Sequence, residues 1–395
     1  MEERIPLADG RMVTADALVG TEFDVIAWRE TDGAQVPRRA RADWNRHEAA
    51  YRVRTHSGRE IIRAAEHPLW SALAESSIKG GRAKGTVTLT PCVRGWTAVA
   101  KLQPDDLVLV PEQHTARGAL PADPDDVALL GYLLGDGGTT KPGQVSFTQQ
   151  DGAALDEFRG MVDRLGCDLY VMRSRPYHYV VRNLDTSHRP RAIGSGRWNP
   201  VVDRVRAWGL EGKGAREKAF PDWAWTLPND QLAILLGRLM ACDGNVYCKE
   251  QAGNRLMARV AITLASERMI RDVEAAMLRL AVWGYVRHRR IRYNGGFNDA
   301  WEWSCRDREA LVRLAGLIDM PGKNEAMRHL VAAVGSRSTA RTRSWPRRNA
   351  PAGYRWERVS EVEELPVTRA LSLEVDEDHP FVTSYVEHHA SAGTG

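Results

Sequence analysis

Residues 128–138 read ALLGYLLGDGG, a dense apolar run that ends in an Asp-Gly pair. Such a run predicts a buried helix that is stopped by glycine. A second run of the same kind, AILLGRLMACDG, occupies residues 233–244. The small residues inside both runs would let two helices pack backbone against backbone. We therefore expect Asp136 and Asp243 to meet where the helices end.

Either run taken alone is more often a plain core helix, but the pattern that follows each aspartate also repeats. The two aspartates lie 107 positions apart (243 − 136). After each we expect a strand, an amphipathic helix and two further strands, because apolar residues recur first at spacing two and then at helical spacing. The expected segments are 144–148, 155–165, 169–173 and 177–182, then 259–263, 269–280, 285–292 and 300–304. This repeat predicts a pseudo-two-fold within one chain, with both motif helices at its axis.

On these motifs the chain resembles the LAGLIDADG homing endonucleases. Residues 129–137 match the first family motif and residues 236–244 the second, whose glycine is displaced by one position to Gly237, with Arg238 after it. The resemblance implies an α+β nuclease that hydrolyses phosphodiester bonds in double-stranded DNA. The implied target is the uninterrupted host gene around the insertion point.

Cleavage of a phosphodiester at neutral pH needs charge neutralisation and an activated water. Carboxylates and carbonyls are the oxygen ligands that Mg²⁺ prefers, so we expect Asp136 and Asp243 to be the catalytic metal pair, with backbone carbonyls of Gly135 and Cys242 as added ligands. The Cys242 side chain is expected to be a small core residue. Lys218 precedes the second motif in a segment that resembles the family block with a basic residue near the active site. Its alternative is a surface lysine.

Basic strands are expected to supply the DNA-binding surface. Side chains alternate between the faces of a strand, so His288, Arg290 and Arg292 share one face of 287–292 and Arg287, Arg289 and Ile291 the other. We expect the first, more basic face to contact DNA, because arginine reads guanine in the major groove and pairs with phosphates. The alternative for each arginine is a solvated charge. The full candidate set is Arg173, Arg175, Arg182, Arg259, Arg287, Arg289, Arg290 and Arg292.

The segments flanking this nuclease are rich in short strands. Residues 1–115 and 352–389 alternate strand patterns with turns such as Asp9-Gly10 and Ser57-Gly58, which predicts one all-β unit split by an insertion. Here the chain resembles the protein-splicing Hint fold of inteins. His67 maps to the histidine that activates the N-terminal scissile peptide. The other mapped positions are His379 with Phe381, the penultimate histidine His389, Ala390 in place of the terminal asparagine, and Ser391 as the first residue after the intein.

Departures from the intein pattern indicate that splicing, an autocatalytic self-excision, is disabled in this chain. It begins with Met1 where inteins carry Cys or Ser, and Ala390 has no side-chain amide to cyclise. Engineering is the favoured interpretation and natural decay the alternative. Residues 391–395 resemble the start of a phosphate-binding loop, which implies an ATPase host such as a helicase or terminase; a flexible tail is the bland alternative. The competing functions are a splicing element whose decayed nuclease only binds DNA, and a non-cleaving LAGLIDADG nucleic-acid-binding protein.

The expected organisation is therefore multidomain, with a Hint domain split by an endonuclease. We expect the N-terminal Hint part at 1–115, the endonuclease at 116–335 with repeats near 120–205 and 218–330, a basic linker at 336–351, the C-terminal Hint part at 352–390 and a C-extein remnant at 391–395. The five cysteines show no CxxC pairing, which favours a reducing compartment and disfavours a structural zinc site. We expect a monomeric, cytoplasmic protein of prokaryotic or phage origin without a membrane segment.

Overall fold

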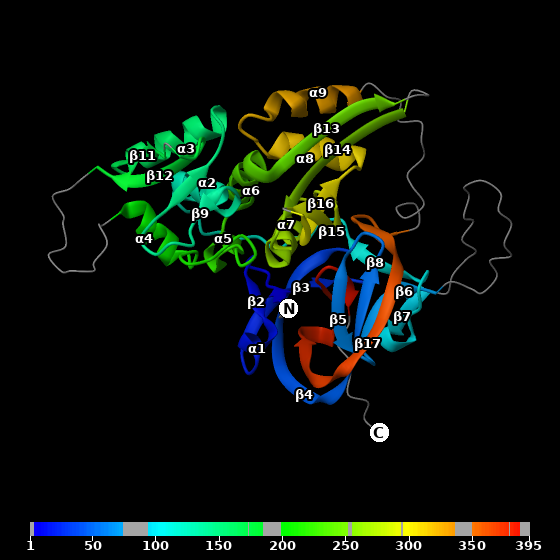
Figure 1. Cartoon of the computed structure of the whole chain (residues 1–395). Coiled ribbons are helices and arrows are strands. Elements are labelled where there is room, and N and C mark those ends of the chain that lie inside the picture. The colour runs from blue at the N-terminus through cyan, green and yellow to red at the C-terminus, as the bar shows by residue number, and fades with distance from the viewer. Residues whose placement is uncertain are drawn as a thin grey trace. The chain divides into compact units, whose positions relative to one another are not determined.

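A computed structural model describes residues 4–73, 94–172, 174–184, 199–251, 255–293, 295–335, 350–378 and 380–387. In it the chain is divided into two units. One unit comprises Met1–Arg117 together with Thr339–Gly395, and we call it the split unit (Figure 1). The other, Gly118–Ser338, is the inserted unit. The basic segment 336–349 lies outside the described residues.

The split unit is built almost entirely from antiparallel strands. Its elements are β1 (Arg4–Pro6), β2 (Met12–Thr14), α1 (Ala15–Leu18), β3 (Glu22–Trp28), β4 (Gln35–Thr55), β5 (Glu60–Ala64), β6 (Pro68–Ala72), β7 (Arg94–Ala98), η1 (Val99–Lys101), β8 (Leu107–Pro111), β17 (Tyr354–Val375), η2 (Asp376–Asp378), β18 (Phe381–Val382) and β19 (Val386–Glu387). The predicted all-β fold of this unit is confirmed.

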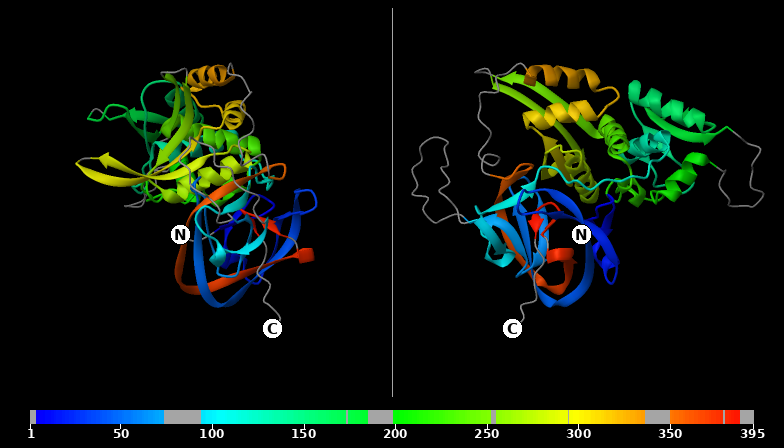
Figure 2. Two further views of the ribbon diagram at one scale, coloured as in Figure 1. Left: turned by 90° about the vertical axis from the view of Figure 1, so that its right-hand side faces the viewer. Right: turned by 180° about the vertical axis from the view of Figure 1, so that it is seen from behind.

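The C-terminal strands complete the sheet that the N-terminal strands begin. Strand β17 pairs with β8 at its start and with β4 along most of its length, as the orange and blue ribbons show in both views of Figure 2. Strand β19 pairs with β6, and β18 with β3. Strand β17 runs unbroken from Tyr354 to Val375, because the 21-residue β4 offers it one long partner.

Two apolar clusters hold the split unit together. In one, Val25 and Ala27 of β3 pack with Phe381 of β18. In the other, Trp28 packs with Leu109 of β8 and Trp356 of β17. Both clusters combine residues from before and after the insertion, so burial of their apolar surface ties the two halves into one fold.

The inserted unit consists of two repeats with one topology. The first contains α2 (Pro124–Gly135), β9 (Gly137–Gly138), β10 (Ser146–Thr148), α3 (Ala153–Arg164), β11 (Cys167–Val171), β12 (His178–Asn183), α4 (Pro200–Ala207) and α5 (Asp222–Trp225). The second contains α6 (Asn229–Asp243), β13 (Gly244–Gln251), β14 (Arg255–Leu264), α7 (Glu267–Arg279), β15 (Tyr285–Tyr293), β16 (Gly296–Cys305), α8 (Arg308–Leu317) and α9 (Asn324–Gly335). Their sheets have the matching orders β9-β10-β12-β11 and β13-β14-β16-β15. The predicted α+β repeat is confirmed.

The residues at the start of α2 and along it explain why the first motif forms a helix. The Asp123 side chain accepts a hydrogen bond from the backbone N–H of Asp125, and Pro124 occupies the first turn, where it loses no helical hydrogen bond. All eight residues from Val127 to Leu134 are buried. The helix ends at Gly135, and Asp136 is its C-terminal cap. In the described part of the chain, no helix is long and apolar enough to span a membrane.

Candidate functional site

Where α2 contacts α6, two glycine positions of α2 have no room for a side chain. A Cβ atom on Gly131 would lie 2.5 Å from the carbonyl oxygen of Leu235, and one on Gly135 would lie 2.6 Å from Cβ of Cys242. The glycines therefore let the backbone of α2 approach α6. The displaced Gly237 of the second motif serves another contact, because a Cβ there would clash with the carbonyl oxygen of Asp319.

This close approach brings the two motif aspartates together. Asp243 Oδ2 lies 3.4 Å from the position that a Cβ on Gly135 would take, one residue before Asp136. Gln149 Nε2 donates to Asp136 Oδ2 at 3.1 Å. Burial raises the pKa of Asp136. Although Asp243 is partly open to solvent, the surrounding protein and then the Asp136 carboxylate raise its pKa to about 6. The Asp136 carboxylate therefore disfavours ionisation of Asp243.

The Lys218 side chain contacts the C-terminal end of α2. Its side chain is buried, with 3% of the residue exposed, so the alternative of a surface lysine is wrong. Its Nζ donates to the carbonyl oxygens of Leu133 and Gly137, both at 2.7 Å, and lies 3.4 Å from that of Gly135. Burial lowers the pKa of the ammonium to about 8, although both aspartates favour its charged form. The lysine thus caps the helix carbonyls and places a cation beside the carboxylates.

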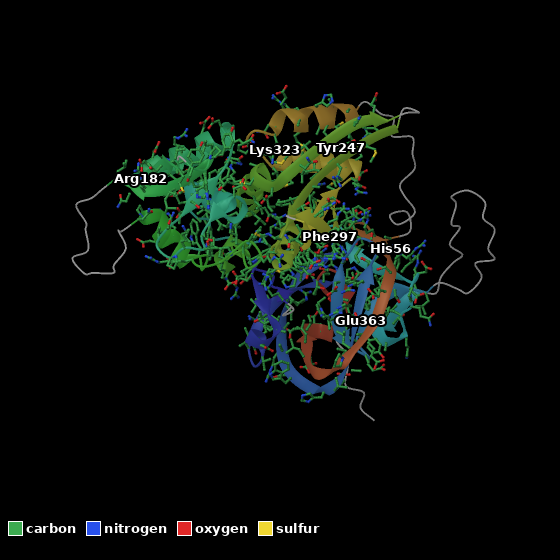
Figure 3. The ribbon with its side chains drawn as sticks, viewed as in Figure 1. His56, Arg182, Tyr247, Phe297, Lys323 and Glu363 are labelled. Atoms are coloured by element: carbon green, nitrogen blue, oxygen red, sulfur yellow. The ribbon has the colours of Figure 1, made fainter. Side chains whose placement is uncertain are left out.

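Lys323 plays the same part at the end of α6 and was not among the predicted residues (Figure 3). Its Nζ donates to the carbonyl oxygens of Met240 at 2.9 Å, Cys242 at 3.1 Å and Gly244 at 2.6 Å. These three acceptors follow Leu133, Gly135 and Gly137 by 107 positions each, the separation of the two aspartates. Burial lowers the pKa of this lysine as well. The site therefore contains two carboxylates and two lysines in pseudo-symmetric positions.

The donor set at this junction fits a hard divalent cation. Among the described residues, no group of three or more His, Cys, Asp and Glu side chains is placed to hold a metal ion. The available oxygens are instead those of two carboxylates and of the Gly135 and Cys242 carbonyls. Mg²⁺ is commonly held by one or two carboxylates and completes its shell with water and phosphate oxygens. The raised pKa of Asp243 beside Asp136 marks a place where a cation would relieve repulsion.

Three of the five predicted arginines of the second repeat lie on one face of its sheet. Arg259 of β14 and Arg289 of β15 both pair with Glu302 of β16, at 3.4 and 2.9 Å, and Arg287 lies opposite Glu302 in register. Arg306, which was not predicted, joins them: burial and then the charge of Arg287 lower its pKa.

The side chains of β15 form two rows, one on each face of the strand. The row with His288, Arg290 and Arg292 begins at the buried Val286, so it is the continuation of the core side of the sheet. Its His288, Arg290 and Arg292 are exposed, and the expectation that this row contacts DNA stays a prediction. The clustered arginines lie on the other row.

The remaining described candidates lie on β12, on the turn that precedes it and on β15. Arg182 of β12, labelled in Figure 3, pairs with Asp168 at 2.6 Å and stacks over Tyr170, while Arg175 is exposed. Arg290 stacks over Phe297, and Arg292 is exposed. Arg173 lies outside the described residues.

In the split unit, His67 occupies a buried polar cluster at the start of β6. Its Nε2 lies 3.1 Å from Oε2 of Glu387, and its ring packs edge-on against Phe381. The other splice-site candidates, His379, His389, Ala390 and Ser391, lie outside the described residues.

Comparison with known proteins gives several curated relatives of this chain. The chain is 27% identical over 288 residues to the replicative DNA helicase DnaB of Rhodothermus marinus, a match that covers 70% of this chain and 27% of that protein. It is 31% identical over 201 residues to protein RecA of Mycobacterium tuberculosis, covering 49% of this chain and 23% of that protein. The chain thus spans about a quarter of the length of these curated relatives. A scan against models of known protein families gives no match.

Solved structures give two kinds of neighbour. One is the Ssp DnaB mini-intein variant M86, with 20% identity and a TM-score of 0.21, covering 28% of this chain and 61% of that one. The other is the LAGLIDADG meganuclease I-AabMI bound to uncleaved DNA, with 9% identity and a TM-score of 0.33, covering 54% and 91%. The structures similar to this chain thus include a mini-intein and a LAGLIDADG endonuclease, matched over separate regions.

Proposed function

We propose that this chain is an intein whose inserted unit is a Mg²⁺-dependent, site-specific DNA endonuclease of the LAGLIDADG kind. One observation carries the proposal: the ends of α2 and α6 bring Asp136 and Asp243 together, with Lys218 and Lys323 bound to equivalent carbonyls. A helix pair that served only as a core would not need two neighbouring carboxylates with raised pKa values at its end.

The residues of this site would divide the work of phosphodiester cleavage between them. The two carboxylates and the Gly135 and Cys242 carbonyls would hold Mg²⁺, which supplies charge neutralisation and an activated water. Lys218 and Lys323 would hold the helix ends in place and add positive charge beside the scissile phosphates. The arginines around Glu302 would bind the DNA backbone, so binding should weaken steeply with salt.

The split unit would be the splicing part. Its sheet is completed only by strands from both sides of the insertion, as expected of a fold that must bring two distant chain ends together. His67 would act at the N-terminal scissile peptide, and His389 at the C-terminal junction. With Ala390, which has no side-chain amide, at the mapped position of the terminal asparagine, we propose that this chain folds but does not splice.

The host is proposed to be a protein that acts on DNA, in the compartment where DNA is processed. Each match covers only about a quarter of the relative's length, as is expected when the matched segment is inserted in a longer protein. The relative named as a replicative DNA helicase favours the helicase among the hosts considered.

The proposal is tested by incubating the chain with a plasmid that carries the rejoined host gene. Linear plasmid that forms with Mg²⁺ and is absent with EDTA supports the endonuclease. Tight, salt-sensitive binding without cutting would replace it with the decayed nuclease that only binds DNA. If the chain neither cuts nor binds this plasmid, the proposed function of the inserted unit is wrong.

A further inference from the structure

Glu387 is a fully buried carboxylate at the end of the described C-terminal segment. It lies on β19, beside Leu69 of β6 and Phe381 of β18, and none of its surface is exposed. A buried charge destabilises the fold unless it is well paired, so such a residue needs a specific set of partners.

Three side chains surround this carboxylate. Arg63 of β5 donates through Nε to Oε2 at 2.5 Å and through Nη2 to Oε1 at 3.1 Å. The Thr383 hydroxyl donates to Oε1. His67 Nε2 lies 3.1 Å from Oε2. Burial alone would raise the pKa of Glu387, but Arg63 and His67 together lower it to about 2, so the group is an anion at neutral pH.

Among the described partners of Glu387, Arg63 supplies a permanent positive charge that balances the carboxylate. His67 is not needed for this balance, and we therefore infer a second role for its contact with Glu387. Nε2 of His67 faces a carboxylate oxygen that can only accept, so this nitrogen carries a proton, and whenever the ring is neutral its lone pair is on Nδ1. The ring is also held by Phe381, whose centroid lies 6.3 Å away at 74°. Carboxylate and aromatic ring together fix both the tautomer and the orientation of His67.

We propose that Glu387 is a positioning residue that holds His67 in this tautomer for the first acyl shift of splicing, an inference that rests on the proposed function of the split unit. In that shift the side-chain sulfur or oxygen of residue 1 bonds to the preceding carbonyl carbon, and the bond from that carbon to the amide nitrogen breaks. The thiol or hydroxyl proton ends on the released amine. His67 would pass that proton through Nδ1, while Glu387 stabilises the transient imidazolium.

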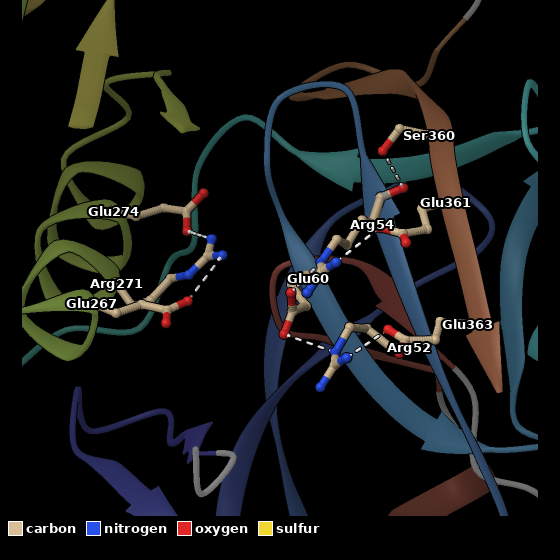
Figure 4. A network of polar contacts seen from close by, with 9 residues as sticks. All are labelled: Arg52, Arg54, Glu60, Glu267, Arg271, Glu274, Ser360, Glu361 and Glu363. Carbon is tan, nitrogen blue, oxygen red and sulfur yellow. Dashed lines mark hydrogen bonds and ion pairs between the residues drawn. The ribbon is translucent and has the colours of Figure 1, made fainter. Parts of the chain in front are cut away.

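The first test uses the chain as it stands. Selective ¹⁵N-histidine labelling, with His67→Asn to assign the signal among eleven histidines, reports which ring nitrogen carries the proton. We expect the Nε2–H tautomer in the parent and a mixture of tautomers in Glu387→Gln. The matched control is Glu363→Gln, which removes a carboxylate that pairs with Arg52 at 2.6 Å on the exposed side of the same unit (Figure 4). The control should leave the His67 signals unchanged, and unchanged signals in Glu387→Gln would overturn the inference.

The second test measures the acyl shift. A Met1→Cys chain that retains Ala390, fused behind a foreign N-terminal domain, should release that domain when a thiol such as dithiothreitol is added. Glu387→Gln should slow this release by about tenfold or more, whereas Glu363→Gln should not. Equal rates for Glu387→Gln and its parent would refute the positioning role.

These readouts separate the inference from the function on which it rests. If the Met1→Cys parent releases nothing, the proposed splicing function fails, and the tautomer measurement still decides whether Glu387 fixes His67. If Glu387→Gln loses the circular dichroism of the parent, Glu387→Asp replaces it. That variant keeps the charge but withdraws the carboxylate by one methylene, and retention of the parent tautomer and rate would then contradict the proposal.

Discussion

Replacement of Gly131 by alanine tests whether the close approach of α2 and α6 positions the site. The new Cβ would lie 2.5 Å from the Leu235 carbonyl oxygen and 2.8 Å from Cβ of Arg238. The first of these is backbone and the second is the root of a side chain, so neither can move aside without shifting α6. Overpacking of this kind costs about 1–3 kcal/mol, and the upper end applies to a backbone obstacle.

Alanine also favours the helix over glycine, by about 1 kcal/mol. The expected net loss for Gly131→Ala is therefore about 2 kcal/mol. The matched control is Gly160→Ala in α3, where the new Cβ would meet only the flexible end of Arg164, at 3.4 Å. The control should stabilise the protein by up to about 1 kcal/mol.

Urea denaturation of the full chain, followed by tryptophan fluorescence and by hydrogen exchange of the α2 amides, measures both effects. The difference between the two variants should be about 3 kcal/mol, the sum of the expected loss and gain. If Gly131→Ala is as stable as Gly160→Ala, the glycine is not required by helix contact, and the explanation for the meeting of the aspartates is wrong.

Three further predictions follow from the contacts around the proposed sites. Lys323→Met leaves three carbonyls at the end of α6 without their donor, so we expect a loss of about 1–3 kcal/mol in the free energy of unfolding, measured by urea denaturation. Lys213→Met, at an exposed position, should change this stability little, and equal effects of the two variants would contradict the capping role. Glu387 has a lowered pKa of about 2 against an ordinary value of 4.5, so its contribution to stability is present above about pH 4.5 and is lost as the pH falls toward 2. The difference in melting temperature between the parent and Glu387→Gln should therefore shrink over that range, and a constant difference would contradict the pairing. Arg287→Ala should weaken binding of the rejoined host DNA and lower the slope of log affinity against log salt by about one, while Arg11→Ala in the split unit should leave both unchanged, as titrations at several salt concentrations would show.

The sequence predicted the parts of this structure that have a period or a repeat. The two apolar runs identified α2 and α6 because each is long, unbroken and closed by Asp-Gly, and the spacing of 107 between Asp136 and Asp243 exposed the repeated topology. The all-β split unit was predicted from its turns. The length of β17 was not predicted, because a single strand of this length cannot be recognised before its 21-residue partner β4 is known.

Residues defined by their partners escaped prediction. Lys323 follows Lys218 by 105 positions rather than 107, and its surroundings, Pro321-Gly322, differ from Arg216-Glu217, so no local pattern links the two lysines. The displacement of 107 applied to Lys218 would have pointed within two residues of it. Glu387 appears in sequence as the ordinary end of a strand, and only the fold shows that Arg63 and His67, 324 and 320 positions earlier, enclose it.

The central claim is that both motif aspartates form one catalytic junction, and strand-resolved cleavage of DNA tests it most directly. Duplex DNA that spans the rejoined host site, labelled on one strand or the other, is incubated with Mg²⁺ and with the parent, Asp136→Asn or Asp243→Asn. The account predicts cutting of both strands by the parent and no double-strand break by either variant. A variant that still breaks both strands at the parental rate would show that its aspartate is not part of the catalytic centre, and would contradict the account.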